Sequence, residues 1–256
     1  MIRASVAAFR LQLWLFRRTP ASLSFFALVP LQCLIFNSLV AHNGRTDLVG
    51  YAVLAPGVLA VLGMAIFEGG EIVTNERAGG TLEGLLATPT PLPAVLLGRV
   101  TAVTLVSLTT VAESWMTTGL VFGQWVAPGH PGITIATLLI MAFAVAGTTT
   151  AMAALFVLSR SVRSFQNSLL YPMLLLGGAF VPVELLPQVF QPLSRFVFLS
   201  WATGLLRDAV ADAPVEDVAL RLSMLLGLGA VGFSAGLLLF RAVLHNIQAR
   251  GTVSFT

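Results

Sequence analysis

Lysine is absent from this sequence, and all 14 of its basic residues are arginine. A phosphate-binding loop of the G-x-x-x-x-G-K-[ST] type requires a lysine, so the chain cannot carry one. Catalysis through a lysine Schiff base is excluded for the same reason. The chain therefore has no lysine-dependent means of binding ATP or of forming a covalent intermediate.

Cysteine and histidine are also scarce. The single cysteine, Cys33, lies in an apolar run, which excludes an intrachain disulfide and is typical of a small buried residue. The three histidines, His42, His130 and His245, fall in separate loops or helix ends. Because no cluster of metal ligands and no nucleophile with a base is visible, we expect neither a bound metal nor catalytic residues.

Charged residues make up only 10% of the chain, whereas 57% of it is hydrophobic and the mean hydropathy is +0.91. Soluble domains do not have this composition. Apolar runs of about 20 residues, the length that crosses a bilayer, recur along the sequence. We therefore expect an all-α polytopic membrane protein in which residues 1–256 form a single transmembrane domain. The expected spans are about 22–41, 48–69, 95–123, 132–158, 165–182 and 219–243.

The arginines lie unevenly between the spans, and their distribution predicts the orientation. Those expected on the inner side are Arg3, Arg10, Arg17, Arg18, Arg77, Arg99, Arg160, Arg163, Arg241 and Arg250. The positive-inside rule then places both termini in the cytoplasm, and residues 124–131 and 182–221 outside. A lysine-free sequence rich in Ala, Leu and Val suggests a bacterial source, and hence the inner membrane. Because the arginines are not gathered on one face, the net charge of +3 does not indicate a nucleic-acid partner.

The first 20 residues have the pattern of an amphipathic helix that lies on the membrane surface. Arg3, Arg10 and Arg17 recur every seven residues, and Arg18 follows them. The apolar positions recur beside them at spacings of four and three and form one face: Ile2, Val6, Phe9, Leu13 and Phe16. Pro20 is expected to end the helix. The alternative is a plain positively charged leader to the first span.

The segment after the fifth expected span is interrupted by Pro182, Pro187 and Pro192. Short, proline-broken apolar helices that dip into the outer membrane surface fit this pattern. The alternative is a seventh span over about 189–206, which would contain Pro192 and Arg195 and would move the C-terminus outside. We expect the short re-entrant helices.

Glu113 is an acidic residue well inside a span. A charge at mid-bilayer costs roughly 2.5–3.5 kcal/mol on the insertion scale. The apolar residues of the same span together contribute about 4–7 kcal/mol, so the span still inserts. The carboxylate then either lines a pathway or a subunit interface, or only joins helices through hydrogen bonds to neighbours such as Thr109, Thr110 or Thr117.

Residues 75–89 form a short polar island between two apolar segments. Thr81 can cap a short helix, and Glu83 in its first turn favours the positive end of the helix dipole. Leu82, Leu85 and Leu86 then share one apolar face. Either a partner protein or the membrane surface must cover that face.

The island reads Glu-Arg-x-x-Gly-Thr-Leu-Glu-x-Leu-x-x-Thr-Pro from residue 76 to residue 89. It resembles the signature of type-2 ABC exporter permeases, most closely those of the daunorubicin-resistance and nodulation types. The resemblance implies that the N-terminal helix is a connecting helix and that 182–206 holds external gate helices. It assigns ATPase coupling to Glu76, Arg77, Gly80, Thr81, Leu82, Glu83, Leu85, Leu86 and Pro89. The gate would include Pro182, Glu184, Pro187 and Trp201.

The resemblance further implies a membrane subunit that exports an amphipathic or lipid-like substrate, such as a drug, a natural product or a lipid-linked glycan. ATP and Mg²⁺ would be bound by two copies of a separate ATPase chain. A second permease copy, or a related permease, would complete the pathway within the membrane lipid. Two other classes remain open at this point: an ion-coupled secondary transporter that uses Glu113, and an intramembrane enzyme.

Overall fold

The computed structural model describes residues 2–44, 48–81, 84, 92–158, 162–211 and 213–250, and these residues contain helices and no strand. The long helices are α1 (Ile2–Arg18), α2 (Pro20–His42), α3 (Val49–Met64), α6 (Leu92–Phe122), α7 (Pro131–Leu158), α8 (Val162–Leu176), α10 (Phe198–Val210) and α11 (Val218–Arg250). The short ones are the π-helix η2 (Ala65–Gly69), α4 (Ile72–Ala78), the 3-10 helix η3 (Val183–Leu185) and α9 (Gln191–Ser194).

Within these residues, five helical stretches are long and apolar enough to cross a membrane. They are Ser22–His42, Val49–Ala78, Leu92–Phe122, Pro131–Phe156 and Val218–Ala242. The expected all-helical polytopic class is therefore confirmed, and each stretch overlaps an expected span. The first helix also forms where expected, although α1 ends at Arg18, two residues before Pro20.

The expected span at 165–182 differs from the structure. It corresponds to α8, which has 15 residues and ends at Leu176. Gly177 and Gly178 follow, and Gly178 has a φ of +68°, which ends the helix at little steric cost. At 1.5 Å per residue, α8 is about 22 Å long, shorter than the hydrocarbon core of about 30 Å. The total of six spans therefore stays a prediction.

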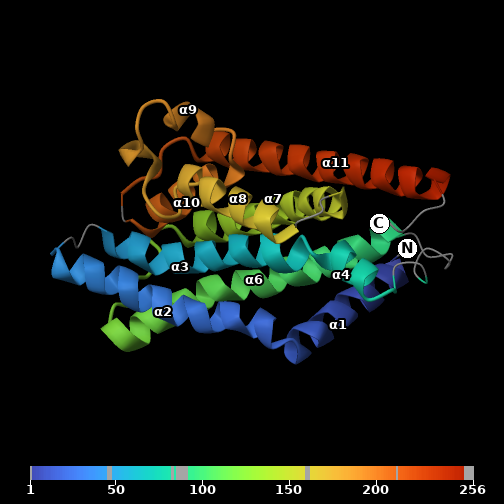
Figure 1. The fold of residues 1–256 in the computed structure, drawn as a ribbon. Coiled ribbons are helices and arrows are strands. Elements are labelled where there is room, and N and C mark those ends of the chain that lie inside the picture. The colour runs from blue at the N-terminus through green and yellow to red at the C-terminus, as the bar shows by residue number, and fades with distance from the viewer. Residues whose placement is uncertain are drawn as a thin grey trace.

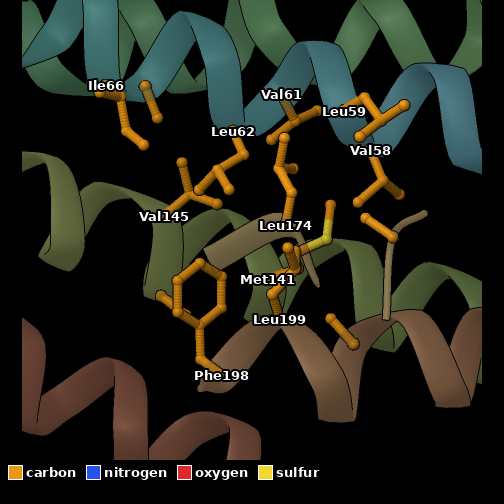
Figure 2. Packing of buried hydrophobic residues seen from close by; sticks show 14 of the residues in the cluster. Val58, Leu59, Val61, Leu62, Ile66, Met141, Val145, Leu174, Phe198 and Leu199 are labelled. Carbon is orange, nitrogen blue, oxygen red and sulfur yellow. The ribbon is translucent and has the colours of Figure 1, made fainter. Parts of the chain in front are cut away.

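The helices surround α3. In the 18 most apolar residues of the α3–α4 stretch, 83% are buried inside the protein, compared with 17% in α2 and in α11. Figure 2 shows the core, in which Val58 and Leu62 of α3 lie toward Met141 of α7 and Leu199 of α10. Because lipid is as apolar as these side chains, close packing rather than escape from water holds such helices together.

Glycines permit the closest helix contacts. A Cβ added to Gly57 of α3 would lie 2.6 Å from the Cα of Val111 in α6. A Cβ on Gly236 of α11 would lie 2.6 Å from the amide nitrogen of Ala151 in α7. The Thr110 hydroxyl also donates to the Gly57 carbonyl at 3.1 Å, so small residues and a buried hydroxyl fix α6 against α3.

Different helices and chain termini lie at the two ends of the bundle. Figure 1 shows α4, the N-terminus and the last turns of α11 at one end, and α9 with the C-terminal end of α2 at the other.

Cys33 of α2 is buried, and its sulfur lies 3.3 Å from the Ser114 hydroxyl of α6. The prediction of a buried cysteine is confirmed.

Candidate coupling site and the proline-rich segment

The candidate coupling site begins with α1, which packs against the start of α6. Ala8, Gln12 and Phe16 recur every four residues and are buried. The Ser5 hydroxyl donates to the Ala94 carbonyl at 2.9 Å. Next to it, a Cβ on Gly98 would lie only 2.2 Å from the Ser5 carbonyl oxygen. Two backbones therefore approach closely here, and any side chain at residue 98 would separate α1 from α6.

The remaining surface of α1 is amphipathic. Arg3, Arg10, Arg17 and Arg18 are exposed, as expected. The predicted apolar face is divided, because Phe16 is buried against the bundle whereas Ile2 is 82% and Val6 is 46% exposed. The Arg18 guanidinium lies 4.1 Å from the ring centroid of Trp14, a cation–π contact. Exposed arginines beside exposed apolar side chains suit a membrane surface, but Gln12 and Phe16 bind the protein itself.

Arg99 of α6 connects three elements at this end of the bundle. Its side chain is 5% exposed. Its Nε donates to Oε1 of Gln12 in α1 at 2.7 Å, and its Nη1 pairs with the Glu76 carboxylate of α4. We call Gln12, Glu76 and Arg99 the coupling cluster. A buried charge of this kind is tolerated because both a carboxylate and an amide oxygen face it.

The second oxygen of Glu76 accepts a hydrogen bond from the Thr81 hydroxyl, which holds the end of α4. The Thr81 amide donates to the Glu76 carbonyl at 3.0 Å, and the Gly80 amide donates to the Arg77 carbonyl at 3.1 Å. Gly80 has a φ of +68°. These bonds form a Schellman motif, in which a left-handed residue closes the helix. The motif explains why glycine stands at residue 80, since other side chains rarely adopt that conformation.

The structure thus brings together only part of the predicted coupling element. Glu76, Gly80 and Thr81 form one hydrogen-bonded unit, and Arg77 lies beside them as a half-buried residue of α4. Thr81 was predicted to cap a following short helix, whose residues lie outside the described part of the chain; in the structure its hydroxyl donates to Glu76 at the end of α4. The other predicted residues lie outside the described part of the chain: Leu82, Glu83, Leu85, Leu86 and Pro89.

Sequence reasoning missed Gln12 and the pairing role of Arg99. Arg99 was used only as a marker of orientation, because nothing nearby in the sequence identifies its partners. Those partners lie 87 and 23 residues away. The available signal was weak: a polar Gln12 on the same face of the N-terminal helix as Ala8 and Phe16.

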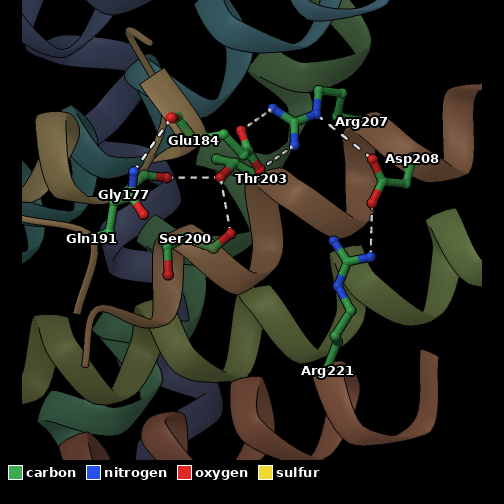
Figure 3. Close-up of polar contacts among 8 residues, drawn as sticks. All are labelled: Gly177, Glu184, Gln191, Ser200, Thr203, Arg207, Asp208 and Arg221. Atoms are coloured by element: carbon green, nitrogen blue, oxygen red, sulfur yellow. Dashed lines mark hydrogen bonds and ion pairs between the residues drawn. The ribbon is translucent and has the colours of Figure 1, made fainter. Parts of the chain in front are cut away.

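A second polar cluster lies in the proline-rich segment (182–206) and continues into α10 and α11 (Figure 3). The Arg207 guanidinium donates to both carboxylate oxygens of Glu184, at 3.0 and 3.4 Å. Arg207 also lies 3.6 Å from Asp208, which accepts a bond of 2.7 Å from Arg221. Partial burial alone would raise the pKa of Glu184, but the hydrogen bonds and positive charge of Arg207 lower it below its ordinary value.

Other contacts fix the shape of the segment. The Thr203 hydroxyl donates to the Gly177 carbonyl at 2.7 Å, and the Trp201 indole donates to the Arg195 carbonyl at 2.9 Å. The carbonyls of Pro182 and Pro187 each accept a turn-forming amide, at 3.0 and 2.8 Å. No single helix covers 189–206, since α9 and α10 are separated at residues 195–197. A pocket of about 230 Å³ lies beside Glu184, Trp201 and Arg207.

Glu113 lies on α6 away from both clusters. Its side chain is half-buried, and its Oε2 has no hydrogen-bond partner among the described residues. Two of the three threonines that were considered as its partners bind elsewhere: Thr109 donates to the Val106 carbonyl, and the single hydroxyl hydrogen of Thr110 is shared between the carbonyls of Ser107 and Gly57. Within the described residues, no group of His, Cys, Asp or Glu has the arrangement of a metal site.

Comparison with known proteins agrees with this geometry. The family model described as "ABC-2 type transporter" matches residues 5–210, which include the coupling cluster and most of the proline-rich segment's contacts. The chain is 32% identical over 207 residues to "Nodulation protein J" of Sinorhizobium fredii (strain NBRC 101917 / NGR234), and the match covers 77% of each chain. It is 32% identical over 186 residues to "Nodulation protein J" of Rhizobium leguminosarum bv. trifolii, with 68% of each chain covered.

Proposed function

The chain belongs to the ABC-2 type transporter family, and on this premise we propose that it moves an amphipathic or lipid-like substrate out of the cell while a separate chain hydrolyses ATP. Its family and its apolar helices make it a multi-pass membrane subunit of an ABC exporter. The partner would be an ABC ATPase, bound in two copies below two permease chains. Those two permeases would be either two copies of this chain or this chain with a related one.

The observation that carries the coupling proposal is the contact of Glu76 with Arg99. Glu76 lies near the start of the polar island (75–89), which resembles the family signature. Arg99 lies on α6, one of the helices long enough to span the membrane. A force applied to residues 75–89 by a moving ATPase would therefore act on α6 through a buried ion pair and on α1 through Gln12. Rigid, hydrogen-bonded contacts of this kind can carry a displacement, whereas a loosely attached loop would absorb it.

The proline-rich segment is proposed as the external gate. It lies at the end of the bundle opposite α4, and its part before α10, residues 182–197, is held by turns, short helices and side-chain bonds from Ser200 and Trp201 rather than by one long helix (Figure 1). Pro182, Glu184, Pro187 and Trp201 would then shape the exit. An opening movement would require the bonds of Glu184 and Thr203 to break, and each of these is partly exposed to solvent.

Two neighbouring spaces support an amphipathic substrate. The pocket beside Glu184 and Arg207 is lined by both polar and apolar side chains and includes Val183. A mainly apolar groove of about 530 Å³ is lined by the flanking residues Pro182 and Leu185 together with Phe36, Tyr51 and Phe180. A molecule with a polar head and an apolar tail matches this pair of surfaces. A lipid-linked glycan, a drug and a natural product all have that character.

The test is reconstitution with the candidate ABC ATPases of the source organism, each expressed together with this chain. The complex in liposomes should hydrolyse ATP, and substrate should stimulate the hydrolysis. The permease alone, shown by mass spectrometry to be free of ATPase, should give no hydrolysis above background. Failure of every candidate ATPase to co-purify with the wild-type chain would count against the proposal.

One observation favours a second function, ion-coupled transport, because Glu113 Oε2 is buried without a partner among the described residues. An ionisable group in a span often marks an ion pathway. The two functions differ in their energy source. Transport that continues after a protonophore collapses the proton gradient, and stops when ATP is removed, supports the ABC exporter. The reverse result, together with loss of transport in Glu113→Gln, supports the ion-coupled carrier.

A further inference from the structure

The helix that leads into α4 contains one π-helical turn, η2. The amide of Gly70 donates to the carbonyl of Ala65, five residues earlier, at 3.1 Å. In a regular α-helix the same amide would donate to Ile66, four residues earlier. The Ile66 carbonyl therefore lacks the partner that an α-helix would give it, at a point buried within the protein.

Gln166 of α8 supplies the missing partner. Its side chain is completely buried, and its Nε2 donates to the Ile66 carbonyl at 3.2 Å. Because a carbonyl only accepts hydrogen bonds, the amide must present its NH₂ group to it. A carbonyl oxygen can accept two bonds, but in this structure Gln166 is the donor to Ile66, whereas the Gly70 amide donates to Ala65 instead. The Gln166 amide therefore compensates the buried Ile66 carbonyl for the bond that the π-helical turn takes away, and so favours the π-helical form.

The surroundings hold the turn on its other side. A Cβ on Gly69 would lie 2.2 Å from Thr149 Cγ2, and a Cβ on Gly70 would lie 2.3 Å from Phe156 Cε2. Both neighbours belong to α7. The ring of Phe156 also stands edge-on to Phe165, the residue before Gln166, with 5.7 Å between centroids. The π-helical turn, α7 and the start of α8 thus form one packed unit.

A change in this turn would alter the rotation and the position of α4. A π-helical turn holds one more residue than an α-helical turn, so its conversion would rotate the following helix by about 100° and displace it by about 1.5 Å. Glu76 lies only seven residues beyond Gly69. Such a rotation would carry its carboxylate away from Arg99. The pairing in the coupling cluster therefore depends on the form of η2.

We propose that Gln166 is a positioning residue, whose amide holds η2 in the π-helical form and thereby sets the rotation of α4 and the pairing of Glu76 with Arg99. Through α8, the same residue is connected to the other end of the bundle, because Gly177 after α8 accepts the Thr203 hydroxyl of α10. The importance of this setting for transport rests on the proposed function, but the setting itself is a property of this chain alone.

The test measures the position of α4 without any ATPase. Spin labels are placed at two exposed positions, Ala78→Cys on α4 and Thr101→Cys on α6, in a Cys33→Ala background in lipid nanodiscs. Pulsed electron spin resonance then gives the distance distribution. Gln166→Leu removes the donor, and Gln166→Met also removes it while keeping the length of the unbranched side chain. Asn167→Leu is the matched control, since residue 167 is the exposed neighbour on the same helix.

We expect both Gln166 variants to give a shifted or a second distance population, and Asn167→Leu to give the wild-type distribution. If Gln166→Leu fails to elute as a folded species in size-exclusion chromatography, Gln166→Met alone decides. A wild-type distribution for a folded Gln166 variant would overturn the proposal, and so would an equal shift in Asn167→Leu. Failure of the proposed function would appear separately, as loss of ATPase co-purification by the wild-type chain.

Discussion

Arg99 and Glu76, 23 residues apart in the sequence, form an ion pair in which the arginine is 5% and the glutamate 19% exposed. The pair joins α6 to α4 at the end of the bundle that holds the N-terminus. Gln12 completes it by accepting a bond from Arg99 Nε. The predicted site of ATPase contact and the helix that was predicted to lie on the membrane are thus attached to the same buried guanidinium.

Replacement of either charge should destabilise this end of the bundle. Arg99→Leu leaves the Glu76 carboxylate without its cation, and loss of one partner from a buried pair costs about 3–5 kcal/mol. The exposed Arg10→Gln on α1 is the control and should have a small effect. Thermal unfolding in detergent, followed by the exposure of the native Cys33 to a thiol dye, measures the difference.

The reversed pair, Glu76→Arg with Arg99→Glu, should recover part of that loss. The Gln12 amide can rotate to present its NH₂ group to the new carboxylate, so each partner regains a bond. A double variant no more stable than the worse single variant would show that the charges act separately. A cooperative recovery would show that they act as a pair.

Acidification should loosen the proline-rich segment. Arg207 lowers the pKa of Glu184 below the ordinary value of 4.5, so their pairing stabilises the folded segment fully above that value. The stabilisation is lost as the pH falls through the lowered pKa, because the protonated carboxyl no longer carries a charge. Arg207 stays charged throughout. Hydrogen exchange of residues 183–186 should therefore accelerate, relative to the rest of the chain, below pH 4.5.

Glu184→Gln should show the faster relative exchange already at neutral pH and should lose the acid-dependent change. Glu216→Gln, an exposed carboxylate outside the cluster, serves as the control. Since Glu184 is 66% exposed, solvent weakens the pair and the effect should stay local. An acid-dependent change of wild-type size in Glu184→Gln would assign the effect to another carboxylate.

The parts of the fold that depend on local patterns could be predicted from the sequence. Continuous apolar runs identified the helices, and the spacing of apolar and arginine residues identified α1. The length of α8 could not be predicted in this way, because the uncharged, mostly apolar sequence continues past Leu176 as far as Val181. The helix ends where Gly178 takes a positive φ and where Thr203 binds the Gly177 carbonyl. The positive φ closes the helix locally through the amides of Gly178 and Ala179, whereas the second contact depends on α10.

The coupling cluster shows the same limit. The island's residues could be assigned by their resemblance to a family, but Gln12 meets Arg99 only because Gly98 lets α1 approach α6. The π-helical turn is likewise invisible in the sequence, since residues 65–69 read Ala-Ile-Phe-Glu-Gly, a pattern that an α-helix could equally hold. Its partner Gln166 lies 100 residues away. Contacts between distant helices decide these features, and local composition does not contain them.

The topology prediction can be checked by labelling introduced cysteines in a Cys33→Ala background. Arg10→Cys on α1 and Glu216→Cys before α11 are both exposed positions. The arginine distribution predicts residue 10 inside and residue 216 outside. A membrane-impermeant thiol reagent added to intact cells should therefore label residue 216 alone. Labelling of residue 10 would contradict a cytoplasmic N-terminus, and protection of residue 216 would contradict an external position for the proline-rich segment.

The leucines of the island give the most direct test of ATPase docking. Leu82, Leu85 and Leu86 are predicted to share one helical face, and burying one leucine is worth roughly 1.5–3 kcal/mol. Leu85→Asp would place a charge on that face and should abolish co-purification of the ATPase. Glu83→Ala should reduce substrate-stimulated hydrolysis more than binding, because the leucines remain while a partner for an arginine of the ATPase is lost.

Two further variants separate docking from folding. Asn75→Asp adds the same charge at an exposed position of α4, outside the predicted face, and should leave co-purification unchanged. The unfolding midpoint of Leu85→Asp without ATPase should equal that of the wild type, since a face reserved for a partner is exposed in the free chain. A lowered midpoint with normal co-purification would place the leucines against the membrane surface or the bundle. In that case the ATPase contact would be limited to the part of the island nearest Glu76.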